Sequence, residues 1–298
     1  MGDSGKAYKA FRVFNVAFML IIMAIMLFPY LNVLAKAFND GKDTALGGIT
    51  VFPRKLSLYN FDMLFRDGKV VKAMGVSVVR VIAGVGLSLL VQFLAAYGFS
   101  KKQLAGRTQM LLFLTLPMFF GGGLIPQYIL FSKLGFLNNF LVYIVPGAFS
   151  LYNMVIIRTY IATLPVSLEE SAKLDGANEL VVFFRIILPL SLPILATIAL
   201  WSAVAHWNDW TTTLYFVTKS DKFTLQYVLM QVLKESERIL KMIQEAQLEG
   251  RVVDTTVSTT PEALQAAQIV LTTLPIILVY PFLQKYFIKG VTLGAIKD

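Results

Sequence analysis

Six uninterrupted apolar runs constrain the fold of this chain more than any other feature. None contains Asp, Glu, Lys or Arg, and they cover residues 13–35, 81–100, 108–132, 134–157, 186–208 and 263–284. Each reaches the roughly 20 residues that a helix needs to cross about 30 Å of hydrocarbon. The runs lack the period-2 alternation of barrel strands, and lipid offers no partner for unpaired backbone groups. The sequence therefore predicts an all-α membrane protein, with six transmembrane helices in one domain over residues 1–298.

Composition excludes an ordinary soluble domain. The chain is 56% hydrophobic and 15% charged, with a mean hydropathy of +0.67. The first run is too long for a signal peptide and lacks a small-residue cleavage pattern, so it is expected to remain as a helix. Without cysteine the chain forms no disulfide or thiolate metal site. The net charge of +9 fits cytoplasmic loops and anionic lipid better than nucleic acid.

Basic residues at the ends of the runs predict the orientation in the membrane. They precede the first run, follow the second and follow the sixth: Lys6, Lys9, Arg12, Lys101, Lys102, Arg107, Lys285, Lys289 and Lys297. Cytoplasmic loops are enriched in Lys and Arg, so both termini are expected in the cytoplasm. Segment 158–185 then lies inside, and segments 36–72, 133–139 and 209–262 lie outside. The first outer loop disagrees with this rule, because it also carries seven Lys and Arg residues.

The inner segment has the signals of two short helices joined by a turn. Pro165 ends the fourth helical region, and Ser167–Glu170 has the S-x-x-E form of a capping box, which predicts a helix from about Leu168. Gly176 tolerates a positive φ and ends that helix. Asn178 is suited to cap the helix that leads into the fifth run. The prediction is a helix-turn-helix over 165–185 on the cytoplasmic face, with an ordinary interfacial loop as the alternative.

The residue spacing of this segment is more specific than its caps. Glu170, Ala172, Gly176, Ile186 and Leu188-Pro189 follow a pattern that resembles the EAA loop of the transmembrane permease subunits of bacterial binding-protein-dependent ABC importers. Ser171 stands where that family usually has Ala, which keeps the side chain small.

Other stretches extend the resemblance over nearly the whole chain. Residues 164–177 look like the carbohydrate branch of the family, typified by the maltose importer's permease subunits. Residues 121–128, 206–210 and 284–291 resemble the oligosaccharide and polysaccharide-fragment subgroup, which includes a subunit of an alginate oligosaccharide importer.

The resemblance implies a type I ABC importer fold in a bacterial cytoplasmic (inner) membrane. It implies that the EAA loop docks into a groove of an ATP-hydrolysing subunit through Glu169, Glu170, Ser171, Ala172, Asp175 and Gly176. The implied partners are a second homologous permease subunit, two ATP-binding subunits, an extracytoplasmic sugar-binding protein and membrane lipid.

The chain has no phosphate-binding loop of its own. The three Gly-Lys pairs, at 5–6, 41–42 and 68–69, are followed by Ala, Asp and Val instead of Ser or Thr. No catalytic cluster of acids, histidines or nucleophiles lies in the runs. The chain is therefore expected to be no enzyme and to bind no cofactor, with ATP and Mg²⁺ held by the partner subunits.

Polar and aromatic residues inside the runs are candidates for the substrate path. Burying them in lipid is costly unless they face a cavity or a partner, and the candidates are Gln92, Gln127, Asn153, Trp201, His206, Trp207 and Asn208. Aromatic faces and amides suit a sugar ligand. The resemblance adds an alginate-type acidic oligosaccharide as one candidate cargo. The alternative is that these side chains bond to neighbouring helices.

A proton-coupled transporter or an autonomous channel is the alternative class of transporter. His206 and Asp209 are three residues apart, so they would share a helix face, and histidine titrates near neutral pH. Such a pair would suit a proton relay in a secondary transporter or an autonomous channel.

Two further patterns concern the outer region and the third run. Apolar residues recur at helical spacing from Leu225, which predicts an amphipathic helix ending near Gly250, and residues 260–262 predict the start of the next helix. The loop 251–259 is hypothesised to help receive the binding protein; the alternative is that this region lies on the bilayer or on the partner permease. Pro117, Gly121–Gly123 and Pro126 are expected to bend or unwind the third run.

Overall fold

The computed structural model describes residues 5–66, 68–249 and 259–295. Within those ranges, every secondary-structure element longer than a single bridged residue is a helix. The predicted all-α fold is therefore confirmed. The contacts divide the chain into two compact units, Met1–Val70 with Leu229–Pro275 and Val71–Val228 with Ile276–Asp298. The expected single permease domain over 1–298 stays a prediction.

The first unit pairs two long helices, α1 (Lys6–Ala37) and the first part of α14 (Pro261–Ala295). The Lys36 ammonium lies 2.6 Å from a Glu262 carboxylate oxygen, and the hydroxyls of Tyr30 and Thr273 are 3.0 Å apart. The Thr260 hydroxyl accepts a hydrogen bond of 3.3 Å from the Ala263 amide, which confirms the predicted start of α14. These contacts join helices that are more than two hundred residues apart in the sequence.

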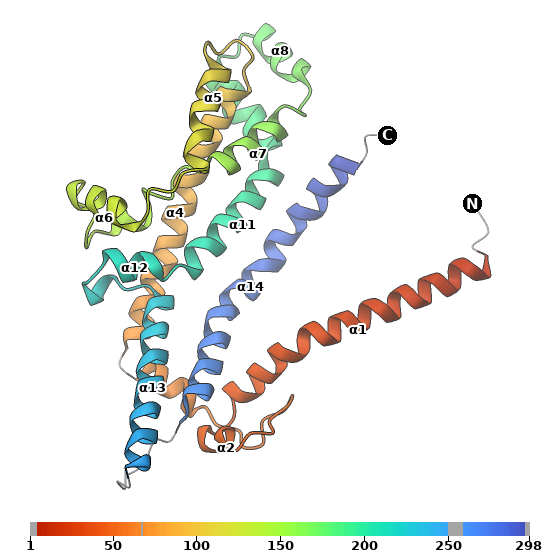
Figure 1. Cartoon of the computed structure of the whole chain (residues 1–298). Coiled ribbons are helices and arrows are strands. Elements are labelled where there is room, and N and C mark those ends of the chain that lie inside the picture. The colour runs from red at the N-terminus through yellow and green to blue at the C-terminus, as the bar shows by residue number, and fades with distance from the viewer. Residues whose placement is uncertain (1–4, 67, 250–258, 296–298) are drawn as a thin grey trace. The chain divides into compact units, whose positions relative to one another are not determined.

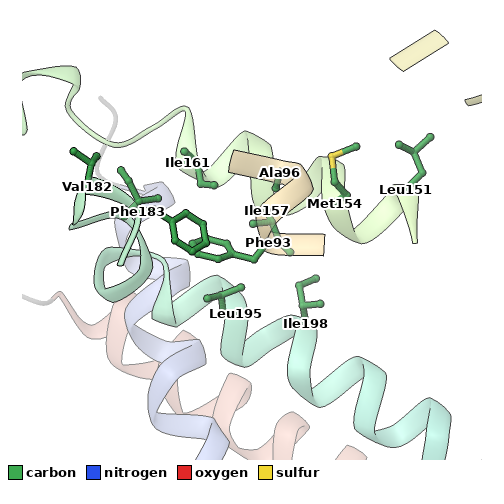
Figure 2. Close-up of a cluster of buried hydrophobic side chains, with 11 residues drawn as sticks. Phe93, Ala96, Leu151, Met154, Ile157, Ile161, Val182, Phe183, Leu195 and Ile198 are labelled. Carbon is green, nitrogen blue, oxygen red and sulfur yellow. The ribbon is translucent and has the colours of Figure 1, made fainter. Parts of the chain in front are cut away.

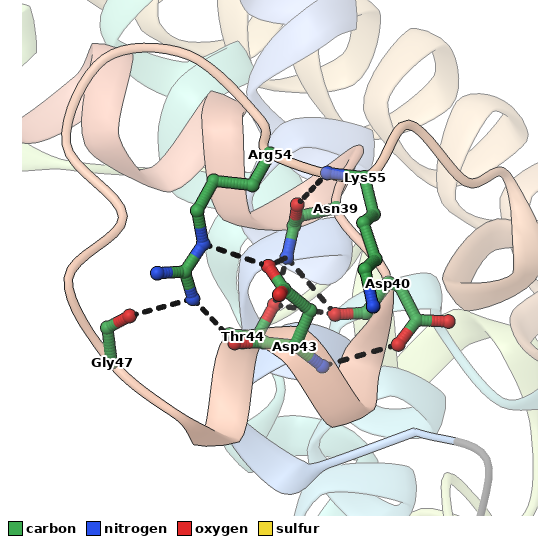
Figure 3. Close-up of polar contacts among 7 residues, drawn as sticks. All are labelled: Asn39, Asp40, Asp43, Thr44, Gly47, Arg54 and Lys55. Carbon is green, nitrogen blue, oxygen red and sulfur yellow. Dashed lines mark hydrogen bonds and ion pairs between the residues drawn. The ribbon is translucent and has the colours of Figure 1, made fainter.

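A polar network closes the loop that follows α1, around the short helix α2 (Gly41–Ala45) (Figure 3). The fully buried Asn39 amide donates 2.9 Å to an Asp43 carboxylate oxygen, and its carbonyl accepts 2.8 Å from the Lys55 amide. Arg54 Nε donates 3.0 Å to the same Asp43 oxygen. One buried amide thus joins two parts of the loop. The helix α3 (Tyr59–Phe65) follows.

The second unit contains most of the remaining helices, which Figure 1 labels in part. They are α4 (Lys69–Ser100), α5 (Arg107–Thr115), α6 (Leu124–Lys133), α7 (Leu151–Ile161), α8 (Val166–Leu174), α9 (Glu179–Val182), α10 (Leu188–Leu190), α11 (Leu192–Asn208) and α12 (Thr211–Phe216). A π-helical segment, Phe183–Ile187, joins α9 to α10. The helix α13 (Leu225–Leu248) follows α12 and belongs to the first unit from Leu229 onward. It confirms the predicted amphipathic helix in its position and length.

The core of the second unit lies where α4, α7 and α11 meet (Figure 2). Met154 and Ile157 of α7 and Ile198 of α11 are fully buried. The Phe93 and Phe183 rings pack with their centroids 4.9 Å apart. Members of each helix recur three or four residues apart, because only one stripe of a helix reaches the core.

The third and fourth apolar runs are interrupted. As expected from its Gly and Pro residues, the third run loses its helix between Thr115 and Leu124, apart from the short 3₁₀ segment Leu116–Met118. The fourth run is α-helical only from Leu151, so a continuous helix over 134–157 is not formed. Gly135 at φ 69° and Asn138 at φ 55° interrupt the helix, because both φ angles lie outside the right-handed helical region.

Three helices are long and apolar enough to cross a membrane: Tyr8–Ala37, Lys69–Ser100 and Pro261–Pro281. Two bent pairs pass the same test, α7 with α8 at 72° and the stretch Glu179–Leu190 with α11 at 73°. By length and composition, the described chain therefore has three candidate spans, or up to five if each bent pair is one span. The predicted six spans and the inside and outside assignments stay predictions.

Candidate functional site

The predicted helix-turn-helix is formed by α8 and α9, but α8 begins earlier than expected. It begins at Val166, directly after Pro165, and no side chain caps it, so the predicted Ser167 capping box is wrong. The fixed φ of proline places it readily just before a first turn, which leaves Ser167 inside the helix. Gly176 ends the helix at φ 85°, as predicted. The Asn178 side chain accepts 2.9 Å from the Val181 amide, which confirms the second cap.

A charged and aromatic cluster holds this helix-turn-helix to the end of α4. Lys101 forms an ion pair with Glu169, and its ammonium lies 4.3 Å from the Tyr97 ring centroid. The Tyr97 hydroxyl donates 2.6 Å to one Glu179 oxygen, and Lys173 lies 2.5 Å from the other. Three segments are therefore braced together by two acids and two bases.

The predicted docking residues divide into two groups. Glu170, Ser171, Asp175 and Gly176 are exposed, whereas Glu169 and Ala172 are half-buried and face the rest of the unit. The apolar side chains of Leu174 and Leu180 are 89% and 67% exposed on either side of the turn. Exposed apolar groups beside a polar turn are typical of an interaction surface. The docking role of the six residues stays a prediction.

A cavity of about 500 Å³ lies in the second unit, within the size range of ligand sites. It is lined from α4, the segment before α7, α7, α11 and α12 by Arg80, Gln92, Val142, Tyr143, Pro146, Gly147, Ser150, Asn153, Trp201, Ser202, Ala205, His206, Asp209 and Thr212. The lining mixes aromatic, amide, hydroxyl and charged groups. It is therefore suited to a polar organic ligand.

The structure brings four of the seven predicted path residues together in this cavity: Gln92, Asn153, Trp201 and His206. Gln127, Trp207 and Asn208 are not among its lining residues. Gln127 is exposed on α6 and Trp207 is buried, while the Asn208 side chain accepts 3.3 Å from Gln226. A role of these three in the path stays a prediction.

A buried ion pair at one end of the cavity was not predicted. Arg80 is 3% exposed, forms an ion pair with Asp209 and donates 2.9 Å to the Asp209 carbonyl oxygen. Its guanidinium carbon lies 4.6 Å from the Tyr143 ring centroid, and the Tyr143 hydroxyl is 2.9 Å from that of Thr213. Burial alone would raise the pKa of Asp209. Arg80 and the hydroxyl of Thr212 have the larger, opposite effect, so the pKa is lowered to about 2.

The sequence contained a signal for this pair. Arg80 directly precedes the second apolar run and Asp209 directly follows the fifth. The predicted orientation places the start of the second run and the end of the fifth run on the outer side of the membrane. Arg80 and Asp209 are therefore expected on the same side, where their opposite charges can pair.

The expected helix face shared by His206 and Asp209 is wrong. Asp209 lies past the end of α11 with ψ 110°, an extended conformation, and is held by Arg80, Thr211 and Thr212. A Cβ atom added to Gly84 would lie 2.6 Å from the His206 ring. The absence of a side chain at Gly84 therefore lets the His206 ring pack closely against α4. The geometry therefore does not build the proposed proton relay.

No cluster of three or more His, Cys, Asp or Glu suited to a metal ion occurs among the residues that the structure describes. The arrangement supports binding at the cavity and docking at the α8–α9 turn.

Curated relatives cover the chain nearly end to end. It is 37% identical over 294 residues to Protein LplC of Bacillus subtilis, covering 98% of this chain and 96% of that protein. It is 33% identical over 291 residues to the polygalacturonan/rhamnogalacturonan transport system permease protein YtcP of the same species, covering 97% and 99%.

A solved structure has the same fold. The match has a TM-score of 0.81 at 25% identity and covers 96% of this chain and 100% of a chain of a bacterial ABC transporter involved in the import of the acidic polysaccharide alginate.

The family model for the binding-protein-dependent transport system inner membrane component matches residues 5–293. The long apolar helices and the interrupted spans agree with that match. The chain therefore belongs to the family of inner membrane components of binding-protein-dependent transport systems.

Proposed function

We propose that this chain is the membrane-spanning subunit of an ATP-driven sugar importer. With a second homologous permease subunit it forms the path for an oligosaccharide that an extracytoplasmic binding protein delivers. Two partner subunits bind ATP and Mg²⁺ and supply the energy. Both termini and the α8–α9 turn lie in the cytoplasm.

The observation that carries this proposal is the braced, exposed turn between α8 and α9. Leu174 and Leu180 present apolar surface to a partner, while Glu169 and Glu179 are fixed by the bases of the cluster around Lys101. The π-helical segment and α10 connect the turn directly to α11, which lines the cavity. A movement of the docked turn would therefore reach the cavity through packed helices, which are the usual carriers of such motion.

The relatives support a saccharide as the cargo. One is named for polygalacturonan and rhamnogalacturonan transport, and the solved structure belongs to an alginate importer. Others are named for arabinooligosaccharides and maltodextrin. The shared class is an oligosaccharide, with an acidic one, such as an alginate fragment, as one candidate.

The Gly176→Phe variant tests the docking. A side chain at φ 85° strains the turn, so we expect the ATP-binding subunits to co-purify poorly and ATP-driven uptake to fall at least tenfold. Gly68→Phe is the matched control, because Gly68 also has a positive φ, of 65°, and open space around it. It should retain the ATP-binding subunits.

Two outcomes would contradict the proposal. One is full ATP-dependent transport by the Gly176→Phe variant. The other is uptake by the chain in vesicles without any ATP-binding subunit, driven by a proton gradient, which would favour a secondary transporter or a channel.

A further inference from the structure

The cavity lined by Arg80, Gln92 and Trp201 contains polar atoms that the fold buries without satisfying. Gln92 is 1% exposed, and its Oε1 has no hydrogen-bond partner among the described residues. Arg80 Nε is likewise buried and unpartnered within the described chain. Burying a polar group without a hydrogen-bond partner destabilises the folded protein. Both residues line the same cavity, so a ligand bound there lies beside two polar groups that the described protein leaves unpaired.

The two groups offer opposite hydrogen-bonding capacities. Arg80 Nε is a donor and Gln92 Oε1 is an acceptor. The Gln92 amide nitrogen is 3.4 Å from the Ala148 carbonyl oxygen, which fixes the orientation of the side chain. A hydroxyl group both donates and accepts, so a polyhydroxyl ligand suits both atoms.

The cavity follows α4 over a distance greater than one sugar ring. Twelve residues separate Arg80 and Gln92, which corresponds to about 18 Å at 1.5 Å per residue. The antiparallel contacts of α4 with α11, Arg80 to Asp209 and Gly84 to His206, place Trp201 toward the Gln92 end. That end thus combines an indole with the amides of Gln92 and Asn153.

The charges of the cavity indicate a neutral ligand. Apart from His206, the charged lining residues are Arg80 and Asp209, which neutralise each other as an ion pair. A carboxylate entering the cavity would compete with Asp209 for the guanidinium and leave one acid without a counterion. Such an unpaired buried charge is strongly unfavourable.

We propose that this cavity is a subsite for uncharged sugar rings of the transported oligosaccharide. The C–H face of one ring lies on the Trp201 indole, and its hydroxyls bond to Gln92 Oε1 and the Asn153 amide. A hydroxyl of another ring, farther along the oligosaccharide at the Arg80 end, accepts from Arg80 Nε. The inference rests on the proposed import function and assigns to this chain a direct selection of neutral over acidic sugar units.

Saturation-transfer NMR on the purified complex of both permease subunits and the ATP-binding subunits, without the binding protein, tests the subsite directly. The probes are maltotriose, arabinotriose and galacturonate trisaccharide. We expect saturation of the neutral probes at least threefold above that of the acidic probe. The signal should fall at least threefold in Gln92→Leu and Trp201→Ala, and Trp201→Phe, which retains an aromatic face, should recover most of it.

Gln109→Leu is the matched control, since Gln109 is an exposed glutamine on α5 outside the cavity. It should bind the neutral probes as the wild type does, and circular dichroism and size-exclusion chromatography verify that each variant folds and assembles. Stronger saturation of the acidic probe, equal signals in the Gln92 and Gln109 variants, or no saturation in a complex that still imports sugar with ATP would overturn the subsite. The last outcome would refute the subsite and still agree with the proposed import function. The import function is tested separately, by comparing the Gly176→Phe and Gly68→Phe variants.

Discussion

The ion pair between Arg80 and Asp209 predicts a large stability effect for Asp209→Asn. The substitution removes the negative charge and keeps most of the geometry. In the wild type, one Asp209 carboxylate oxygen accepts hydrogen bonds from the Thr211 hydroxyl at 2.7 Å and from the Thr212 amide at 3.1 Å. The side-chain oxygen of asparagine can accept the same two bonds. The Asp209 carbonyl also keeps its 2.9 Å bond from Arg80. What remains is a guanidinium that is 3% exposed and has lost its counterion.

The magnitude follows from the burial of that charge. Two unit charges about 4 Å apart attract by about 4 kcal/mol at an effective dielectric constant of about 20. Removing one partner of a buried pair costs about 3–5 kcal/mol. We expect Asp209→Asn to lower the free energy of unfolding by about 3 kcal/mol, since the carbonyl contact survives.

A double-mutant cycle provides the assay. Arg80→Met, Asp209→Asn and the double variant are unfolded by denaturant in mixed micelles and followed by far-UV circular dichroism. The double variant should lose about 2 kcal/mol less than the sum of the single variants, because neither charge is then left alone. Additivity of the two losses within about 0.5 kcal/mol would refute the reasoning.

Two further predictions concern the loop that follows α1 and the close contact of α4 with α11. The hydrogen bond from Asn39 lowers the pKa of Asp43 below its usual value despite burial. The stability that Asp43 contributes is therefore present above its unfolded pKa of about 4 and is lost as pH falls through the lower folded pKa. Acid titration of the apparent melting temperature should show this loss in the wild type and a smaller one in Asn39→Ala, and identical profiles would contradict it. Gly84→Ala should cost about 1–3 kcal/mol through collision with the His206 ring. Gly86→Ala, with open space around it, should cost nothing, and a similar loss in both denaturation curves would argue against the contact.

Much of the fold was predictable because lipid leaves the backbone few choices. The apolar runs of α1, α4 and α14 had to be helical, since a bilayer core provides no partner for free amides and carbonyls. The local signals at Gly176, Asn178 and Thr260 were also read correctly. Each depends on one residue and its near neighbours in the sequence.

The errors occurred where a local signal had a local competitor. The Ser167 capping box was a valid pattern, but Pro165 started the helix earlier and left the serine inside it. The run 134–157 is apolar enough for a span, yet its helix forms only from Leu151. Hydropathy indicates whether a segment is stable in lipid. It contains no information on the backbone angles of Gly135 and Asn138, whose positive φ values interrupt the helix.

The sequence by itself determined the class of the protein and the position of the α8–α9 turn, because burial in lipid and turn chemistry act over a few neighbouring residues. The tertiary structure alone decided which polar residues share a cavity. Gln92, Asn153, Trp201 and His206 meet there, and Gln127, Trp207 and Asn208 do not, although all seven satisfied the same rule. The difference arises because α4, α7 and α11 pack along particular faces, and that packing also joins Arg80 to Asp209 across more than a hundred residues of chain.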